Sequence, residues 1–124
     1  MKIYLIEDEK SIRDTLKVYL ENLGHHVVAE VEPFTCAVYH GGVCSQEKAC
    51  ADVLIIDFHL PKINGLDFVS MLKENGCKGL ITNVLLMSGD TSSIDREKAE
   101  SLGCLVVQKP MRFSFVREWL QSIS

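Results

Sequence analysis

Five side chains that could do chemistry together each follow an apolar run of this sequence: Glu7, Asp8, Asp57, Ser88 and Lys109. Three of them are carboxylates, which repel one another at close range unless a cation lies among them. Mg²⁺ suits such ligands, because it is a hard ion that takes one or two carboxylates and keeps several waters. Beside such an ion, an aspartate can accept a phosphoryl group covalently as an acyl phosphate. A lysine would supply positive charge to the phosphoryl oxygens, and a serine would supply a hydrogen bond.

The hydrophobic pattern predicts elements that could bring these side chains together. Five short apolar runs are predicted strands: Lys2–Ile6, Val27–Val31, Val53–Ile56, Thr82–Met87 and Cys104–Val107. Apolar residues at helical spacing lie between the strands, and Gly24 and Gly103 are natural helix ends. Ser92 and Ser93 are candidate caps for the helix that ends before Gly103. The strands lack alternation, which is typical of strands buried on both faces. We therefore predict an α/β fold with a parallel sheet covered by helices on both sides.

The predicted sheet places the candidate residues at one edge. In an open parallel sheet the carboxyl ends of the strands meet at the same edge, and binding sites form there, where the strand order reverses. Residues as far apart in the sequence as Glu7 and Lys109 should therefore line a single pocket.

Size and composition limit the classes of protein to which the chain could belong. It has 124 residues, from which we expect a single domain, 1–124, with no output domain in this chain. The formal net charge of −4 argues against direct binding of nucleic acid, which needs clustered lysine and arginine. No apolar run approaches the roughly 20 residues of a membrane span, and the first run is too short for a signal peptide. We expect a cytoplasmic protein with no membrane partner, whose five cysteines are thiols rather than disulfides.

Four segments of the chain match a known family. They are Glu7-Asp8, the run from Asp57 to Leu66 (DFHLPKINGL), Met87-Ser88-Gly89 and Lys109-Pro110. With them the sequence resembles, over nearly its whole length, the receiver domain of response regulators in bacterial-type two-component systems. The resemblance implies a flavodoxin-like, doubly wound (βα)5 fold whose five-stranded parallel sheet has the order 2-1-3-4-5.

The resemblance also implies a role for each matching residue at the metal site. Asp57 would be the phosphoacceptor, and Glu7 and Asp8 would hold Mg²⁺, or Mn²⁺ in its place. The backbone carbonyl of His59 would be a further ligand of the same ion. In the loop that follows, Gly65 would permit an unusual backbone angle or a close approach.

The remaining implied roles concern the phosphoryl group and the partners. Lys109 and Ser88 would contact the phosphoryl group, and a two-state element around Ser88 would respond to it. The donor would be a histidine kinase or a phosphotransfer protein. The output partner is unknown from the sequence, and phosphorylation could produce a homodimer.

Three positions near the matching segments bear on how the signal is timed and transmitted. Many receivers carry an aromatic residue three positions before the lysine, and here that position is Val106, so aromatic reorientation cannot carry the signal. His59 and Asp90 each lie two residues after a site residue, where a side chain can block or orient the attacking water. His59 could also donate a hydrogen bond to the phosphoryl group, or could simply be exposed.

A cysteine-bearing segment, residues 33–51, is the second departure from the family pattern. Its proline and paired glycines predict that any second helix there is short or broken. Cys36, His40, Cys44 and Cys50 could bind zinc or respond to redox state, although their spacing matches no common zinc motif. The alternative is that these thiols act as separate small hydrophobic residues.

Three other functions remain open at this point. A small Mg²⁺-dependent phosphohydrolase would use Asp57 as nucleophile, but such enzymes usually carry an acid where this chain has His59. A flavodoxin-like cofactor binder would need a phosphate-binding loop after the first strand, where this chain has Glu7-Asp8-Glu9. A zinc or redox sensor in the cysteine segment could coexist with phosphoryl transfer.

Overall fold

The computed structural model describes residues 1–31, 51–74 and 83–123. These residues form a single five-stranded sheet with helices on both sides. The strands are β1 (Lys2–Ile6), β2 (His26–Glu30), β3 (Val53–Asp57), β4 (Val84–Ser88) and β5 (Cys104–Gln108). The helices of the described part are α1 (Lys10–Asn22), α2 (Gly65–Glu74), α3 (Arg96–Ser101) and α4 (Phe113–Ile123), with a short 3-10 turn, η1 (Thr91–Ser93).

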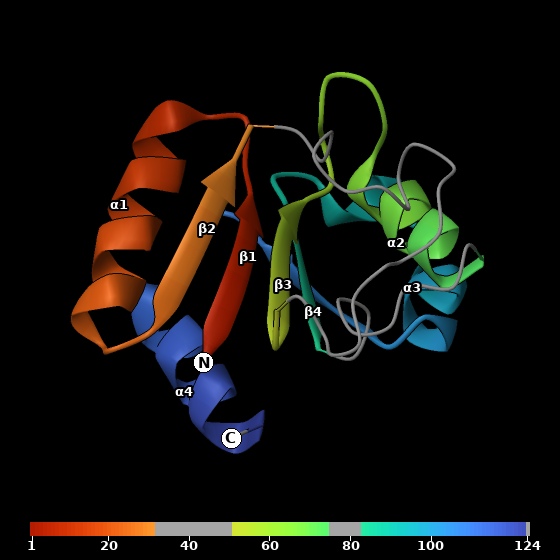
Figure 1. Ribbon diagram of the computed structural model, residues 1–124. Helices are drawn as coiled ribbons and strands as arrows, with labels where there is room; N and C mark the ends of the chain where they lie inside the picture. Colours follow the sequence, from red (N-terminus) through yellow and green to blue (C-terminus); the bar gives the residue numbers. More distant parts are fainter. Residues whose placement is uncertain (32–50, 75–82, 124) are drawn as a thin grey trace.

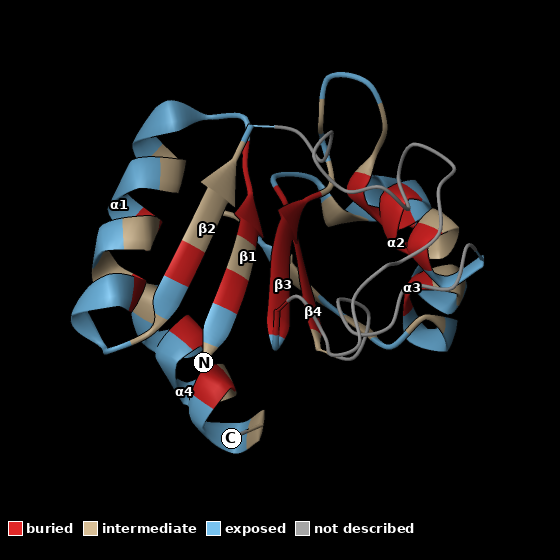
Figure 2. Cartoon of the chain, in the orientation of Figure 1, coloured by how far each residue is buried: buried red, intermediate tan, exposed pale blue. Residues whose placement is uncertain are grey.

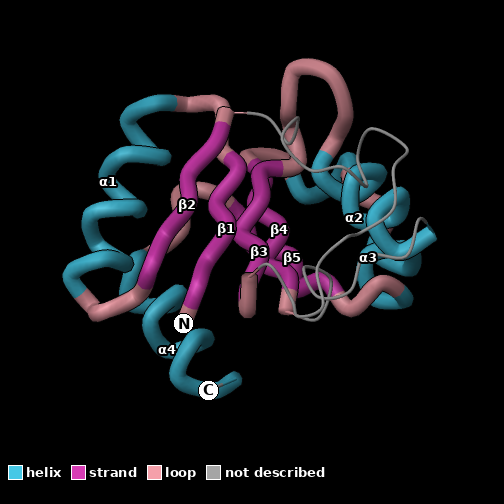
Figure 3. The backbone as a smooth tube through the Cα atoms, in the orientation of Figure 1, coloured by secondary structure: helices cyan, strands magenta, loops and turns pink. Residues whose placement is uncertain are grey.

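All neighbouring strands run parallel, in the order β2-β1-β3-β4-β5. The predicted α/β fold and strand order are therefore confirmed. The order reverses between β1 and β3, so the loops that follow these two strands diverge at the same edge of the sheet, which is the upper edge in Figure 3.

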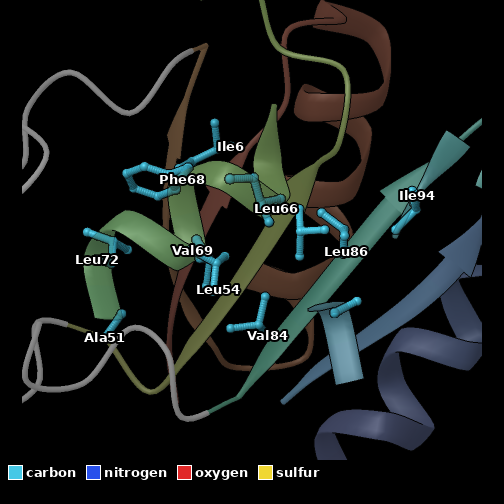
Figure 4. Close-up of a cluster of buried hydrophobic side chains, with 12 residues drawn as sticks. Ile6, Ala51, Leu54, Leu66, Phe68, Val69, Leu72, Val84, Leu86 and Ile94 are labelled. Carbon is cyan, nitrogen blue, oxygen red and sulfur yellow. The ribbon is translucent and has the colours of Figure 1, made fainter. Parts of the chain in front are cut away.

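The sheet separates two hydrophobic cores. Helices α1 and α4 cover one face, where Leu16, Leu20 and Val116 pack against inward-facing residues of β1, β3 and β4. Helices α2 and α3 cover the other face, and Figure 4 shows Phe68, Val69 and other side chains of α2 against that side of the strands. Successive strand residues point to opposite faces, so each central strand contributes to both cores.

Burial follows from this layering. Every residue of β3 and β4 is buried, which explains why their sequences lack alternation (Figure 2). The edge strands β2 and β5 have only one neighbouring strand each and are partly exposed. The longest described helix, α1, has 13 residues, which is too short for a bilayer span of roughly 20. The same limit excludes every other helix of the described part.

Several element ends differ from the sequence predictions. Strand β2 spans His26–Glu30 rather than Val27–Val31, and β5 extends to Gln108 rather than to Val107. Asp57 and Ser88 are the last residues of their strands rather than the first residues of the loops. The predicted caps Ser92 and Ser93 are wrong, because both lie in η1 and the Asp95 side chain accepts the capping hydrogen bond at the start of α3. Aspartate caps as well as serine does, so local propensity could not choose among the three. The predicted helix ends at Gly24 and Gly103 are confirmed by left-handed φ angles of 93° and 76°.

Candidate functional site

Three carboxylates converge at the carboxyl edge of the sheet. Glu7 directly follows β1, Asp8 is next to it, and Asp57 ends β3, the strand beside β1. One oxygen from each carboxylate lies within 4.8 Å of the other two. Glu7 and Asp57 are buried, whereas Asp8 is exposed at the mouth of the cluster.

Lys109 brings a positive charge to this cluster from the residue after β5. Its Nζ donates to both oxygens of Glu7, at 3.2 Å for Oε1 and 3.0 Å for Oε2. It also lies 3.1 Å from Oδ2 of Asp57. The Lys109 backbone N–H donates to the carbonyl of Ser88, at 2.8 Å, which anchors the lysine to the end of β4.

One lysine does not balance the buried negative charge. Burial raises the pKa of Glu7 to about 7, and this effect outweighs the opposing hydrogen bond and ion pair with Lys109. Burial likewise raises the pKa of Asp57, again against Lys109. The same carboxylates raise the pKa of Lys109, despite its burial, so the lysine stays charged. The pocket would therefore hold a further cation favourably.

The donor set fits Mg²⁺. The cluster offers carboxylate oxygens only, at separations that one ion could bridge, and the exposed side at Asp8 leaves room for the waters that Mg²⁺ retains. Nitrogen and sulfur ligands, which zinc prefers, do not join this cluster within the described part of the chain. Glu7, Asp8 and Asp57 could thus hold a magnesium ion.

The loop after β3 fixes the orientation of Asp57. The backbone N–H of His59 donates to Asp57 Oδ1 at 3.2 Å, so the two carboxylate oxygens have different partners. Gly65 N–H donates to the carbonyl of Phe58 at 2.9 Å and closes this loop against the strand. A Cβ at Gly65 would lie only 2.6 Å from the Asp57 carbonyl oxygen. Close approach, rather than an unusual backbone angle, is therefore what requires glycine here.

Ser88 is held inside the loop that follows β4. Its hydroxyl donates to the Asp90 carbonyl at 3.0 Å and accepts from the Asp90 N–H at 3.1 Å. The Asp90 carboxylate in turn accepts from the N–H and hydroxyl of Ser92, and these bonds lower its pKa. Because a hydroxyl has one proton, Ser88 must release the Asp90 carbonyl before it can donate to a phosphoryl group.

Comparison with known proteins identifies the family. The family model described as "response regulator receiver domain" matches residues 3–121, which is nearly the whole chain. This chain belongs to the response regulator receiver family. The carboxylate cluster, the lysine and the serine at the strand ends lie in the part of the receiver that the match covers.

Relatives and solved structures agree with this assignment. The receiver is 33% identical over 79 residues to chemotaxis protein CheY1 of Helicobacter pylori, covering 60% of this chain and 57% of that protein. It is 27% identical to the transcriptional regulatory protein YxdJ of Bacillus subtilis, covering 98% of this chain and 49% of YxdJ. A CheY-like receiver domain from Methylobacillus flagellatus superimposes with a TM-score of 0.75 at 24% identity, over 100% of this chain and 98% of that one.

The relatives also show how much of a regulator the receiver represents. The chain spans 40% of the alkaline phosphatase synthesis regulator SphR of Synechococcus elongatus, to which it is 27% identical over 82% of this chain. It therefore corresponds to less than half of the length of such transcriptional regulators.

Two predicted tuning residues of the receiver lie at the rim of the site. The His59 side chain is exposed, and its ring meets Phe58 edge-on with 5.0 Å between ring centroids. Asp90 is exposed in the loop across from it, and His59 is among the groups that lower its pKa. Val106 packs against the core beneath α2 and α3.

Two residues that the sequence reasoning did not select also shape the site. Arg13 of α1 donates to the carbonyl of Glu7 at 2.9 Å and so braces the turn after β1. Gln108 ends β5, just before Lys109, and its side chain bonds to the loop after β4. Arg13 could have been found from its place one turn into the helix after Glu7, whereas no sequence signal pointed to Gln108.

The candidate zinc or redox residues Cys36, His40, Cys44 and Cys50 lie outside the described residues, as does the predicted second helix. The free thiol of Cys104, in the described part, is partly buried, and burial raises its pKa to about 11, which leaves it unreactive as a thiolate.

Proposed function

We propose that this receiver accepts a phosphoryl group on Asp57 from a histidine kinase or a phosphotransfer protein, in a reaction that depends on Mg²⁺ or Mn²⁺. The observation that carries the proposal is the arrangement around Asp57. A buried aspartate lies in one carboxylate cluster with Glu7 and Asp8, and the Lys109 Nζ lies 3.1 Å from its Oδ2. Among the structural neighbours, a receiver domain from Pseudomonas aeruginosa has a magnesium ion coordinated in its active-site cleft.

The residues suit a displacement at phosphorus. An Asp57 oxygen forms the new bond to phosphorus, while the bond from phosphorus to the donor nitrogen breaks and leaves its electron pair on that nitrogen. Lys109 offsets the charge of the phosphoryl oxygens, and the N–H of His59 holds the Asp57 carboxylate in place. When bound, the metal would neutralise the carboxylates and attract the phosphoryl oxygens.

The rim residues would govern the response to phosphorylation and its reversal. The His59 carbonyl would complete the metal ligands, and Ser88 would turn its hydroxyl from Asp90 to the phosphoryl group. His59 and Asp90 would set how readily water attacks phosphorus and regenerates the Asp57 carboxylate with release of inorganic phosphate. The only catalysis we assign is therefore on the chain itself.

The proposed partners and location are those of other receivers. We assign residues 1–124 to one receiver domain that acts in the cytoplasm, where kinases find ATP. Its relatives include both a chemotaxis protein and transcriptional regulators, so the output partner could be a separate protein or a further domain. A phosphorylation-dependent homodimer would be one form of output. The acidic charge of −4 argues against direct contact with nucleic acid by this domain.

A labelling experiment tests the proposal. With Mg²⁺ and a small phosphodonor such as acetyl phosphate, the intact mass should rise by one phosphoryl group, and the Asp57→Ala variant should not react. Asp14→Ala is the matched control, because Asp14 is exposed on α1 and does not belong to the carboxylate cluster, so this variant should label like the parent. Equal labelling of Asp57→Ala and the parent would refute the proposal.

The same protein sample can be used to distinguish the function of a receiver from that of a phosphohydrolase. A receiver should release about one equivalent of phosphate per labelled chain and should not turn over an external phosphomonoester. Sustained hydrolysis of p-nitrophenyl phosphate that is lost in Asp57→Ala would instead support the enzyme. Metal analysis of the parent and of Cys44→Ser would test the cysteine segment separately.

A further inference from the structure

One side chain of β5, that of Gln108, makes two hydrogen bonds to the loop between β4 and α3. Gln108 Nε2 donates to the carbonyl of Gly89 at 3.1 Å, and Gln108 Oε1 accepts from the Thr91 hydroxyl at 3.2 Å. The two bonds flank Asp90 on both sides. A carbonyl can only accept, so the orientation of the Gln108 amide is settled by Gly89.

The segment between these two bonds is the one that occupies Ser88. The Ser88 hydroxyl exchanges two hydrogen bonds with the backbone of Asp90. If Ser88 turns to a phosphoryl group on Asp57, its bond to the Asp90 carbonyl must break. The Asp90 carbonyl then lacks its donor, so the backbone from Gly89 to Thr91 would rearrange, and the bonds to Gln108 hold that backbone in place.

Gln108 is also connected to the charged site. It is paired with Ser88 in the sheet register, and the next residue, Lys109, contacts Glu7 and Asp57 through its Nζ. The position that holds an aromatic switch in many receivers is Val106, which packs in the core and has no side-chain group that could hydrogen-bond to the loop. Gln108 is thus a side chain of β5 that hydrogen-bonds directly to the loop, and loop movement would reach the strand through it.

We propose that Gln108 is a positioning residue that holds the β4–α3 loop in its unphosphorylated arrangement, and that phosphorylation of Asp57 breaks its two hydrogen bonds. The inference rests on the proposed phosphorylation of Asp57. In this proposal, Gln108 opposes the phosphorylated arrangement of the loop and contacts neither the metal nor the phosphoryl group. Removing its amide should favour the arrangement in which Ser88 is free to donate.

The effect should appear in the binding of a phosphoryl mimic. Gln108→Met keeps the length of the side chain but removes both hydrogen bonds, so beryllofluoride with saturating Mg²⁺ should bind about three- to tenfold more tightly than to the parent. Thr91→Val removes one bond and should give a smaller gain. The double variant should gain no more than Gln108→Met alone, because both changes remove the same contact.

Two further measurements separate positioning from a general structural effect. Mg²⁺ affinity without beryllofluoride should stay within about twofold of the parent, because Glu7, Asp8 and Asp57 lie outside this loop. Gln121→Met, an exposed change of the same chemistry on α4, should leave both affinities at the parent values. Isothermal titration calorimetry on the full chain measures each constant.

The outcomes distinguish this inference from the proposed function. If the parent binds no beryllofluoride, or Asp57→Ala binds it equally well, the proposed function fails and the Gln108 inference fails with it. If the parent binds it and both Gln108→Met and Thr91→Val bind with unchanged or weaker affinity, only the role of Gln108 is overturned. Should Gln108→Met fail to fold, Thr91→Val decides alone.

Discussion

Gly65 offers the sharpest test of how the Asp57 loop is packed. A methyl group at this position would meet the Asp57 carbonyl oxygen at 2.6 Å and Leu86 Cδ1 at 2.9 Å. Ordinary contact begins near 3.4 Å, so the loop and β3 would have to separate by about 0.8 Å. The oxygen belongs to the backbone of a strand that is hydrogen-bonded on both sides, so no rotamer change can relieve the contact.

The expected cost follows from that geometry. Overpacking of a rigid site costs about 3 kcal/mol, and the better helix propensity of alanine at the start of α2 returns up to about 1 kcal/mol. Gly65→Ala should therefore lower the free energy of unfolding by about 2 kcal/mol, or the melting temperature by about 8 °C. Because Asp57 must move with its carbonyl, Mg²⁺ affinity should also fall several-fold.

Gly89→Ala is the matched control. A Cβ at Gly89 would have nothing within 4 Å, and Gly89 has no left-handed φ angle. Alanine there should leave stability unchanged or raise it by up to about 1 kcal/mol through the unfolded state. Urea unfolding followed by circular dichroism and by Trp119 fluorescence measures both variants. Equal midpoints for Gly65→Ala and Gly89→Ala would refute the reasoning.

The remaining predictions concern charge. Because the pKa of Glu7 is about 7, Mg²⁺ must displace a proton from this carboxyl below that pH. The Mg²⁺ affinity should therefore rise as the pH approaches 7 and level off above it. Equal affinities at pH 5.5 and pH 8 would contradict this. The pKa of Glu7 in the folded protein lies above its ordinary value of 4.5, so Glu7 contributes stability to the metal-free protein that is fully present below about pH 4.5 and is lost as the pH rises through about 7. Lys109→Met leaves Glu7 and Asp57 without their cation and should destabilise the metal-free protein by about 2–3 kcal/mol at pH 8. At pH 5 the loss of stability should be much smaller, because the carboxyls can be protonated. Equal losses in urea unfolding at both pH values would exclude that explanation. Lys98→Met breaks an exposed 2.8 Å ion pair with Asp67 and should cost only about 0.5 kcal/mol at low salt and almost nothing in 1 M NaCl; a loss that does not depend on salt would point to packing instead.

The sequence alone was sufficient for the architecture. Strands such as β3 are short and apolar up to their last residue, and helical spacing separates them, so local pattern predicted an α/β fold with a parallel sheet. The strand order came from the resemblance to receiver domains, not from the pattern. The rules of parallel sheets placed Glu7, Asp8, Asp57 and Lys109 at one edge, because each follows or ends its own strand. Local pattern was weaker at element ends, where Ser92, Ser93 and Asp95 have similar capping propensities.

Tertiary structure alone decided the state and the connections of the site. Residues 102 positions apart, Glu7 and Lys109, share hydrogen bonds, and burial of Glu7 sets its pKa, which depends on surroundings that no local pattern encodes. Glycine is needed at position 65 because the Asp57 carbonyl, on a neighbouring segment, lies too close for a Cβ. Gln108 makes its two hydrogen bonds because the packing of β4 beside β5 brings the loop after β4 within reach. Hydrophobic periodicity is a property of one element and can therefore be recognised in the sequence. Charge balance and close approach depend instead on the distances between elements.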